Sequence, residues 1–319
     1  MTNKRQAGVL LHPTSLPSKY GIGDLGQEAY QFVDFLASAK QTLWQTLPLG
    51  PTSYGNSPYS SLSAFAGNHF MISIDKLVNW GLLAENQITI PHFESKYQVD
   101  FDLVSKFKME LFEIAYNNFK NIQGDLKKEY NKFCIENSDW LDDYALFMAA
   151  KKAHNYKIWT EWEKDLVKRE NLDIYFEKYA DGVGLHKFLQ FAFFKQWMEL
   201  KHYANQKNIK IIGDIPIFVA YDSADVWANK KFFTIDEEGK QITVAGVPPD
   251  YFSETGQLWG NPLYNWDEMK KDNFSWWKQR IANLLKAVDI IRIDHFRGFE
   301  AFWEIPAGSP NAIKGRWVK

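Results

Sequence analysis

Acidic, basic and imidazole side chains gather at the end of one short apolar segment near the C-terminus. The run 289–293 is rich in isoleucine and too short for a helix, so it predicts a buried parallel strand. Asp294 and His295 follow it, and Gly298 provides a turn. In open α/β sheets and in (β/α)8 barrels, ligands bind at this end of the strands. Asp294 is therefore predicted to be a functional carboxylate; the alternative is a solvated, charge-paired strand end.

Two neighbours shape the chemistry expected of Asp294. Arg292 lies two positions earlier and points to the same side of its strand, where a guanidinium favours the ionised carboxylate that a nucleophile needs. Asp214 ends the preceding predicted strand, so it is expected beside Asp294. Retaining glycoside chemistry requires two carboxyl groups roughly 5–5.5 Å apart. Asp214 is embedded in its strand, two positions before Pro216, and is not a convincing acid.

Other chemistries find weaker support in the sequence. Residues 21–26 match G-x-G-x-x-G, but eight residues separate them from His12, and no acidic residue closes the second strand. We keep a nucleotide-dependent α/β enzyme as an alternative hypothesis for the function of the chain. The seven histidines lack metal-ligand spacing, and no G-x-S-x-G elbow is present. The sequence therefore predicts neither a metal site nor an organic cofactor.

The elements that would position these groups alternate along the chain. Apolar runs predict strands at 7–12, 42–48, 209–216 and 289–294, and helical spacing marks 27–40, 185–197 and 277–285. Between them lie a Gly-, Pro- and Ser-rich loop at 49–68, a helical stretch at about 74–182 and a second long loop at 218–266. Four parallel strands with elaboration after strands predict about the first four βα units of a (β/α)8 barrel, a TIM-barrel type of α/β fold.

The composition of the chain limits the classes of partner that it is expected to bind. A net charge of -2 argues against nucleic acid and anionic membranes, and no apolar run reaches membrane-spanning length. Aromatic residues make up 16% of the chain, which suits stacking against sugar rings. The lone cysteine, Cys134, cannot form an intrachain disulfide, so we expect a cytoplasmic protein. The oligomeric state is left open.

Several motifs occur in the same order as in a known family. They are His12–Pro17, Tyr20–Gly26, Gly50–Thr52 with Ser57–Tyr59, Gly213–Pro216 with Asp222–Trp227, Gly246–Phe252 with Gln257–Tyr264, and Arg292–Gly298. Together they resemble the 4-α-glucanotransferases called amylomaltase or disproportionating enzyme, glycoside hydrolase family 77, relatives of the α-amylases. The resemblance runs from end to end of the chain.

The resemblance implies roles for single residues. Asp294 matches the nucleophile that forms a covalent glucosyl-enzyme, and Arg292 and His295 match residues that position it and contact the donor sugar. Further matches to residues on the glucan side are Asp214, Ser57, Tyr59, Tyr251, Phe252, Trp259 and Asn261, with Tyr54 at a secondary glucan-binding patch. The family needs no metal or organic cofactor, and its partners are maltooligosaccharides and α-1,4-glucans.

The expected organisation follows from the same comparison. Residues 1–75 would supply barrel strands 1 and 2 with a rim loop, 76–183 a helical inserted subdomain, and 184–319 strands 3 and 4 with a glucan-binding loop at 219–266. The acid/base glutamate and the stabilising aspartate of the family have no matching position, and Glu300 and Glu304 follow the wrong strand. We therefore expect a retaining glucanotransferase that is inactive as this chain alone; the alternative is a non-catalytic glucan-binding half-barrel.

Overall fold

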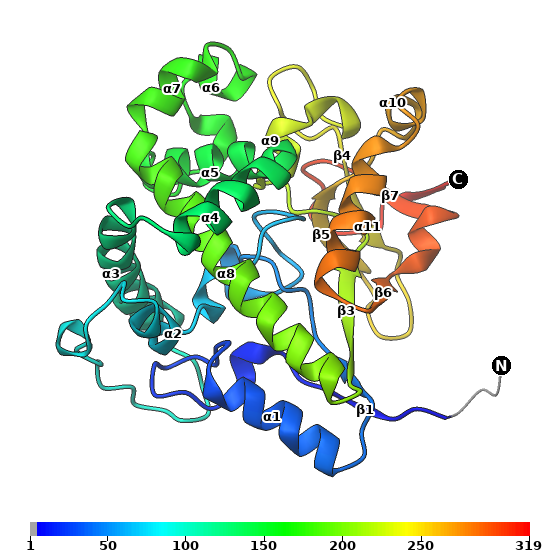
Figure 1. Cartoon of the computed structure of the whole chain (residues 1–319). Helices are drawn as coiled ribbons and strands as arrows, with labels where there is room; N and C mark the ends of the chain where they lie inside the picture. Colours follow the sequence, from blue (N-terminus) through cyan, green and yellow to red (C-terminus); the bar gives the residue numbers. More distant parts are fainter. Residues whose placement is uncertain (1–4) are drawn as a thin grey trace.

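A four-stranded parallel sheet forms the framework of the molecule, which is therefore an α/β fold (Figure 1). The computed structural model describes residues 5–319, apart from the side chain of Tyr54. The strands are β1 (Gly8–Leu10), β2 (Leu43–Gln45), β3 (Lys210–Pro216) and β6 (Ile290–Asp294), in the order β1-β2-β3-β6. All three pairings are parallel, as the sequence predicted.

The two faces of this sheet differ. Val9, Trp44 and Ile211 are register partners on the face that packs against helices, where Trp44 and Ile211 are fully buried. On the other face Leu10 is 54% exposed, and Ile212 and Ile290 are half-buried. The strand predicted to be buried at 289–293 is therefore only half-buried, and β1 is exposed as well, because the described residues cover mainly one face.

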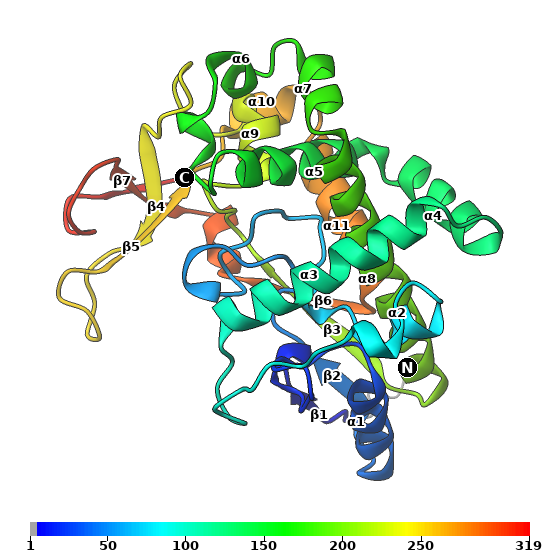
Figure 2. The same ribbon diagram turned by 90° about the vertical axis from the view of Figure 1, so that its left-hand side faces the viewer.

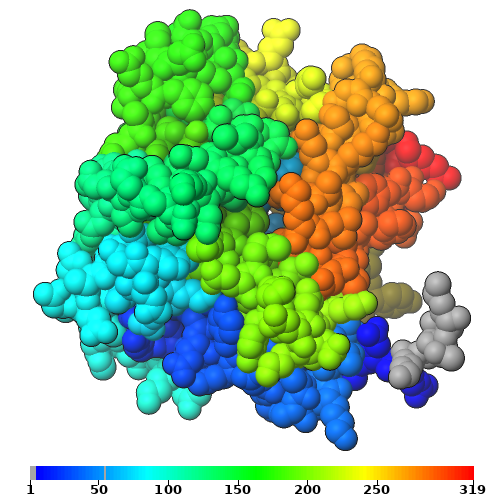
Figure 3. Space-filling view, viewed as in Figure 1, coloured from blue at the N-terminus to red at the C-terminus, as the bar shows by residue number. Residues whose placement is uncertain are grey.

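The helices fall into two groups. Against the sheet lie α1 (Gln27–Ser38), α8 (Ala180–Gln206) and α11 (Ser275–Ala287). Between β2 and β3 the chain also forms α2 (Ile74–Asn79), α3 (Phe101–Lys120), α4 (Asp125–Glu136), α5 (Ser138–Ala153), α6 (Lys164–Lys168) and α7 (Leu172–Lys178). The long α8 contacts α1, α3, α4, α5, α11 and β3, and so joins this helical body to the sheet. Figure 3 shows the helical body in teal and green beside the orange C-terminal part.

A second, antiparallel sheet was not predicted. It contains β5 (Gln257–Pro262), β4 (Thr243–Val247), β7 (Phe302–Pro306) and β8 (Arg316–Val318), in that order, and projects from one side in Figure 2. We expected loops at 218–266 and after Gly298, but these segments contain strands, as well as α9 (Ala224–Ala228) and α10 (Trp266–Lys271). The strands are short, and β4 pairs with β7 across more than fifty residues of sequence, so local patterning gives little sign of them.

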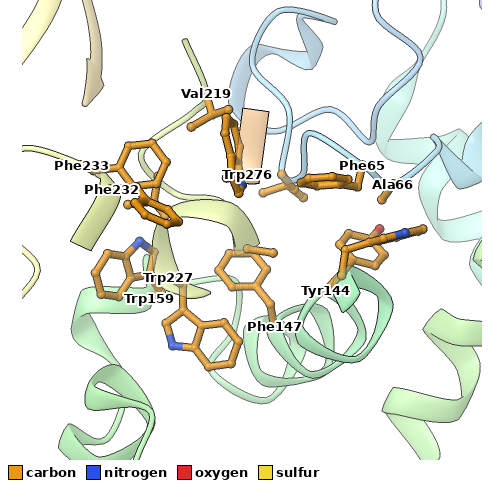
Figure 4. Close-up of a cluster of buried hydrophobic side chains, with 14 of the residues drawn as sticks. Phe65, Ala66, Tyr144, Phe147, Trp159, Val219, Trp227, Phe232, Phe233 and Trp276 are labelled. Atoms are coloured by element: carbon orange, nitrogen blue, oxygen red, sulfur yellow. The ribbon is translucent and has the colours of Figure 1, made fainter. Parts of the chain in front are cut away.

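A large aromatic core joins the helical body to the segment after β3. Phe147 of α5 packs with Trp227 of α9, and Trp159, Phe233 and Trp276 belong to the same cluster (Figure 4). Burying each such side chain contributes roughly 1.5–3 kcal/mol. Much of the 16% aromatic content therefore serves the core. Among residues 5–319, no helix combines the length and the apolar character needed to cross a membrane.

Candidate active site

The carboxyl ends of β3 and β6 bring two carboxylates onto one guanidinium. Register pairs Asp214 with Arg292 and Pro216 with Asp294. Arg292 donates one hydrogen bond of 2.6 Å to Oδ2 of Asp214 and another of 2.8 Å to Oδ1 of Asp294. The hydrogen bond to Asp214, above all, raises the pKa of Arg292, so the guanidinium stays charged. The predicted placement of Asp214 beside the strand end of Asp294 is confirmed.

The two carboxylates differ in their access to solvent. The side chain of Asp214 is fully buried, whereas that of Asp294 is 38% exposed. The hydroxyl of Tyr59 also donates to Oδ2 of Asp214, at 2.6 Å. Burial of Tyr59 and, to a smaller extent, this hydrogen bond raise its pKa to about 12, which keeps the phenol protonated as a donor. Asp214 is thus a bound structural carboxylate, and Asp294 is the one that a ligand can reach.

His295 is held by backbone geometry and by an aromatic neighbour. Its φ of 52° lies in the left-handed region, which is strained for a residue with a side chain and is common at functional sites. The indole of Trp259 meets the imidazole edge-on, with ring centroids 5.0 Å apart. Partial burial lowers the pKa of His295, so the ring is neutral at pH 7. Neutral imidazole can donate through one nitrogen and accept through the other.

A cleft of 720 Å³ opens beside these groups. The predicted site residues that line it are Asp294, His295, Ser57, Tyr59, Trp259 and Asn261. Asn261 of β5 donates to the carbonyl of Val219 at 2.8 Å, which fixes the second sheet against the segment after β3. The volume lies within the usual range of about 300–1,000 Å³ for small-molecule sites and exceeds what one sugar ring needs.

Four predicted residues with described side chains do not line this cleft: Tyr251, Phe252, Arg292 and Asp214. Tyr251 and Phe252 lie in the turn between β4 and β5, where both side chains are fully exposed and neither lines the cleft. The side chain of Tyr54 lies outside what the structure describes. Arg292 is not a lining residue and acts on the cleft through Asp294.

The other residues that form the walls were not predicted from the sequence. They are Ser53, Ser60, Pro216, Ile217, Phe218, Ala220, Tyr221, Asp222, Leu258 and Gly260. Pro216 is the last residue of β3, and five of the others follow it directly. The rule that selected Asp294, that residues just beyond a strand's carboxyl end face the site, would also have selected this segment.

The glycine-rich segment 21–26 serves packing. A Cβ on Gly23 would lie 2.1 Å from the carbonyl oxygen of Pro13, and the amide of Gly26 donates to buried Asp24 at 2.8 Å. These contacts fold the segment onto its own neighbours. Among the described residues, no group of three His, Cys, Asp or Glu side chains could hold a metal ion.

Known proteins match this chain along almost its whole length. The chain is 51% identical over 322 residues to a 4-alpha-glucanotransferase of Synechocystis and 49% identical over 318 residues to that of Thermus thermophilus. Each match covers 99% of this chain but only 64% and 63% of the relative, so the chain spans just under two thirds of their length. The solved amylomaltase of Streptococcus agalactiae in complex with acarbose matches with a TM-score of 0.95 at 42% identity, covering 99% of this chain and 64% of that one.

A more distant structure shares the fold alone. The amylomaltase of Corynebacterium glutamicum has a TM-score of 0.77 at 15% identity, over 98% of this chain and 44% of that one. The model of the 4-alpha-glucanotransferase family, glycoside hydrolase family 77, matches residues 11–319. The chain belongs to this family.

Proposed function

We propose that the protein takes part in the transfer of α-1,4-glucan segments between maltooligosaccharides by a retaining double displacement. The observation that carries the proposal is the solvent-accessible carboxylate of Asp294, held by Arg292 at the edge of a cleft large enough for several sugars. The sequence relatives that match this chain are named 4-alpha-glucanotransferases, and a matching amylomaltase was solved in complex with acarbose.

The chemistry proposed for Asp294 is nucleophilic. Its carboxylate oxygen attacks the anomeric carbon, the bond from that carbon to the glycosidic oxygen breaks, and an acid protonates the departing oxygen. The 4-hydroxyl of a second glucan then attacks the same carbon, loses its proton to the group that acted as acid, and releases Asp294. We assign Arg292 to orienting the nucleophile, and His295, Ser57, Tyr59, Trp259 and Asn261 to sugar contacts. Tyr251 and Phe252 remain proposed contacts for a glucan that extends beyond the cleft.

We do not assign the role of the acid to any carboxylate near the cleft. Asp214 already accepts bonds from Arg292 and Tyr59, and Asp222 is paired with Lys151 at 2.5 Å. Both carboxylates are held by these donors, and we assign the role of the acid to neither. We therefore keep the prediction that this chain alone is inactive on natural glucans, although it carries the nucleophile.

The architecture that we propose is part of a TIM barrel. The parallel strands β1, β2, β3 and β6 would be its first four, with residues 76–183 as an inserted helical subdomain and 219–266 as an elaborated rim. The half-exposed sheet face that carries Leu10 and Arg292 would then be the barrel interior. A cytoplasmic site of action is proposed from the lone Cys134.

An activated donor tests the nucleophile separately from the acid. Fluoride leaves as an anion without protonation, so α-maltosyl fluoride should glycosylate Asp294 in this chain. We expect intact-mass analysis to show one maltosyl adduct, mapped to Asp294 by peptide fragmentation and absent from Asp294→Asn. Binding of maltoheptaose without any adduct would favour the glucan-binding module, and an adduct in Asp294→Asn would refute the nucleophile. Incubation with maltotriose tests the prediction of inactivity, which steady release of glucose would refute.

A further inference from the structure

One wall of the cleft is held in place from the helical body. Tyr221 and Asp222 lie in the segment between β3 and α9, and both line the cleft. The side chain of Asp222 is 29% exposed, so a ligand in the cleft can reach it. Neither residue belongs to the sheet that carries Asp294. Their position therefore depends on what lies behind them.

Lys151 of α5 lies directly behind Asp222. Its side chain is only 5% exposed, and its ammonium group donates to Oδ2 of Asp222 at 2.5 Å. The same nitrogen donates to the carbonyls of Tyr156 and Lys157, at 3.4 and 3.2 Å. A lysine ammonium has three protons. All three have acceptors, so this buried cation is fully satisfied in a single geometry.

Trp159 fixes the neighbouring residue from the same side. Its indole nitrogen donates to the carbonyl of Tyr221 at 2.9 Å, and the two rings meet edge-on with centroids 5.8 Å apart. The hydroxyl of Tyr221 donates to the carbonyl of Gly239 at 2.7 Å. Tyr221 is thus tied at its backbone and at its ring tip. The pair Tyr221–Asp222 is a fixed wall, and Asp222 is its charged member.

We propose that Asp222 is a further sugar-binding carboxylate of the cleft and that Lys151 is the positioning residue that holds it. The inference rests on the proposed function, since it takes a glucan as the ligand of the cleft. Sugar hydroxyls donate hydrogen bonds, and an ionised carboxylate is a strong acceptor for them. The ion pair holds Asp222 in a single orientation, which spares a bound sugar the entropy of ordering it.

Affinity for maltoheptaose, measured by calorimetry on this chain, tests the inference. We expect Lys151→Met and Asp222→Asn each to weaken binding about tenfold, the size of coupling found between contacting residues. Lys151→Arg should recover most of the affinity, because it restores a cation behind Asp222. The matched control is Lys152→Met, the adjacent lysine of the same helix, which is 53% exposed and pairs with Glu113 away from the cleft. It should bind as the wild type does.

A double variant separates binding from folding. Either single change can strand a buried charge and lower stability, whereas Lys151→Met with Asp222→Asn removes both charges and should recover the melting temperature. Affinity should stay about tenfold weak in the double variant if Asp222 contacts the glucan. Recovery of affinity together with stability would overturn the assignment, as would wild-type affinity in either single variant.

Amide hydrogen exchange gives a readout that needs no ligand. Faster exchange at 217–223 is expected in Lys151→Met and not in Lys152→Met. Unchanged exchange would refute the positioning role of Lys151 even if the wild type bound no glucan. Absence of glucan binding by the wild type would instead overturn the proposed function. The two failures are thereby distinguishable.

Discussion

Arg292 and Asp294 lie two residues apart on β6, and the guanidinium of the first donates a 2.8 Å hydrogen bond to the carboxylate of the second. The alternation of a β-strand puts both side chains on one face, so the pair is built into a five-residue segment. The other arm of Arg292 reaches Asp214, whose side chain is fully buried on the next strand. The nucleophile proposed here is therefore anchored to the sheet through one planar cation.

Replacing Arg292 by methionine should cost both stability and glycosylation. Asp214 would keep only Tyr59 as donor to its buried Oδ2, so we expect the free energy of unfolding to fall by about 2 kcal/mol, less than for a fully buried pair, because Arg292 is half-exposed. Urea unfolding measures this loss, and intact-mass kinetics with α-maltosyl fluoride measure the loss of orientation. Arg292→Lys keeps the charge but not the planar fork of the guanidinium. Its unfolding free energy and glycosylation rate should therefore lie between those of the wild type and of Arg292→Met. Wild-type glycosylation by Arg292→Met would contradict the orienting role.

Tyr59→Phe isolates the second donor to Asp214. Only the hydroxyl is removed, so the ring keeps its packing and Arg292 still neutralises the carboxylate. We expect a loss of about 1 kcal/mol in unfolding free energy, the usual contribution of one hydrogen bond. Maltoheptaose affinity should fall as well, because Tyr59 lines the cleft. Ser53→Ala, at another lining residue of the same loop, removes a hydroxyl whose 2.6 Å hydrogen bond is to Ser60, and is the comparison for losing one hydrogen bond that does not involve Asp214.

The sequence was sufficient for the parallel sheet and for the strand-end carboxylates. Isoleucine-rich runs and helical spacing are local signals, and the carboxyl-end rule places Asp214 and Asp294 together without knowledge of any distance. The same rule was not applied to the segment after Asp214, so Asp222 went unassigned although it lines the cleft.

What could not be predicted depends on contacts distant in sequence. Strand β7 pairs with β4, and the residues next to β7 in the sequence do not indicate that partner. The expected boundary at 183/184 lies inside α8, which runs unbroken from Ala180 to Gln206. The exposure of Leu10 likewise depends on what covers one face of the sheet, which periodicity cannot report.

Buried His186 should make stability depend on pH. Burial lowers its pKa to about 3, against 6.5 for the exposed ring, so between these values the unfolded chain binds a proton that the folded chain does not. The contribution of His186 to the free energy of unfolding is therefore lost progressively as the pH falls below 6.5. In His186→Gln the loss between pH 7 and pH 4.5 should be about 2 kcal/mol smaller than in the wild type.

Urea unfolding at a series of pH values measures that difference. Asp24 acts in the opposite direction, because burial raises its pKa to about 6, so the folded state holds a proton that the unfolded state has released. The comparison of wild type with His186→Gln removes this contribution, which both proteins share. His202→Gln, at an exposed histidine of the same helix, should leave the pH dependence unchanged. Parallel curves for the wild type and His186→Gln would refute the prediction.

Two glutamines of α8 anchor turns in the segment between β2 and α2, and they offer a matched pair. Gln190 accepts from the amide of Gly67 at 2.7 Å and donates to its carbonyl at 2.9 Å, and Gln196 makes the same pair of bonds to Ser73. Leucine at position 190 leaves the amide and the carbonyl of Gly67 without partners, whereas leucine at position 196 strands only the amide of Ser73, because the Ser73 carbonyl still accepts from the amide of Leu77 at 3.4 Å. We expect a loss of about 3 kcal/mol of unfolding free energy in Gln190→Leu and of about 2 kcal/mol in Gln196→Leu.

Only Gln190→Leu should also weaken glucan binding, because Gly67 closes the loop that carries Ser57 and Tyr59 into the cleft, whereas Ser73 lies beyond that loop. Calorimetry with maltoheptaose at a temperature where both variants are folded measures this difference. Equal affinities would mean that the loop is positioned without Gln190. A Gln190→Glu variant adds a check on the mechanism, since it retains the acceptor for the Gly67 amide but loses the donor to its carbonyl, and it should lie between wild type and Gln190→Leu in both measurements.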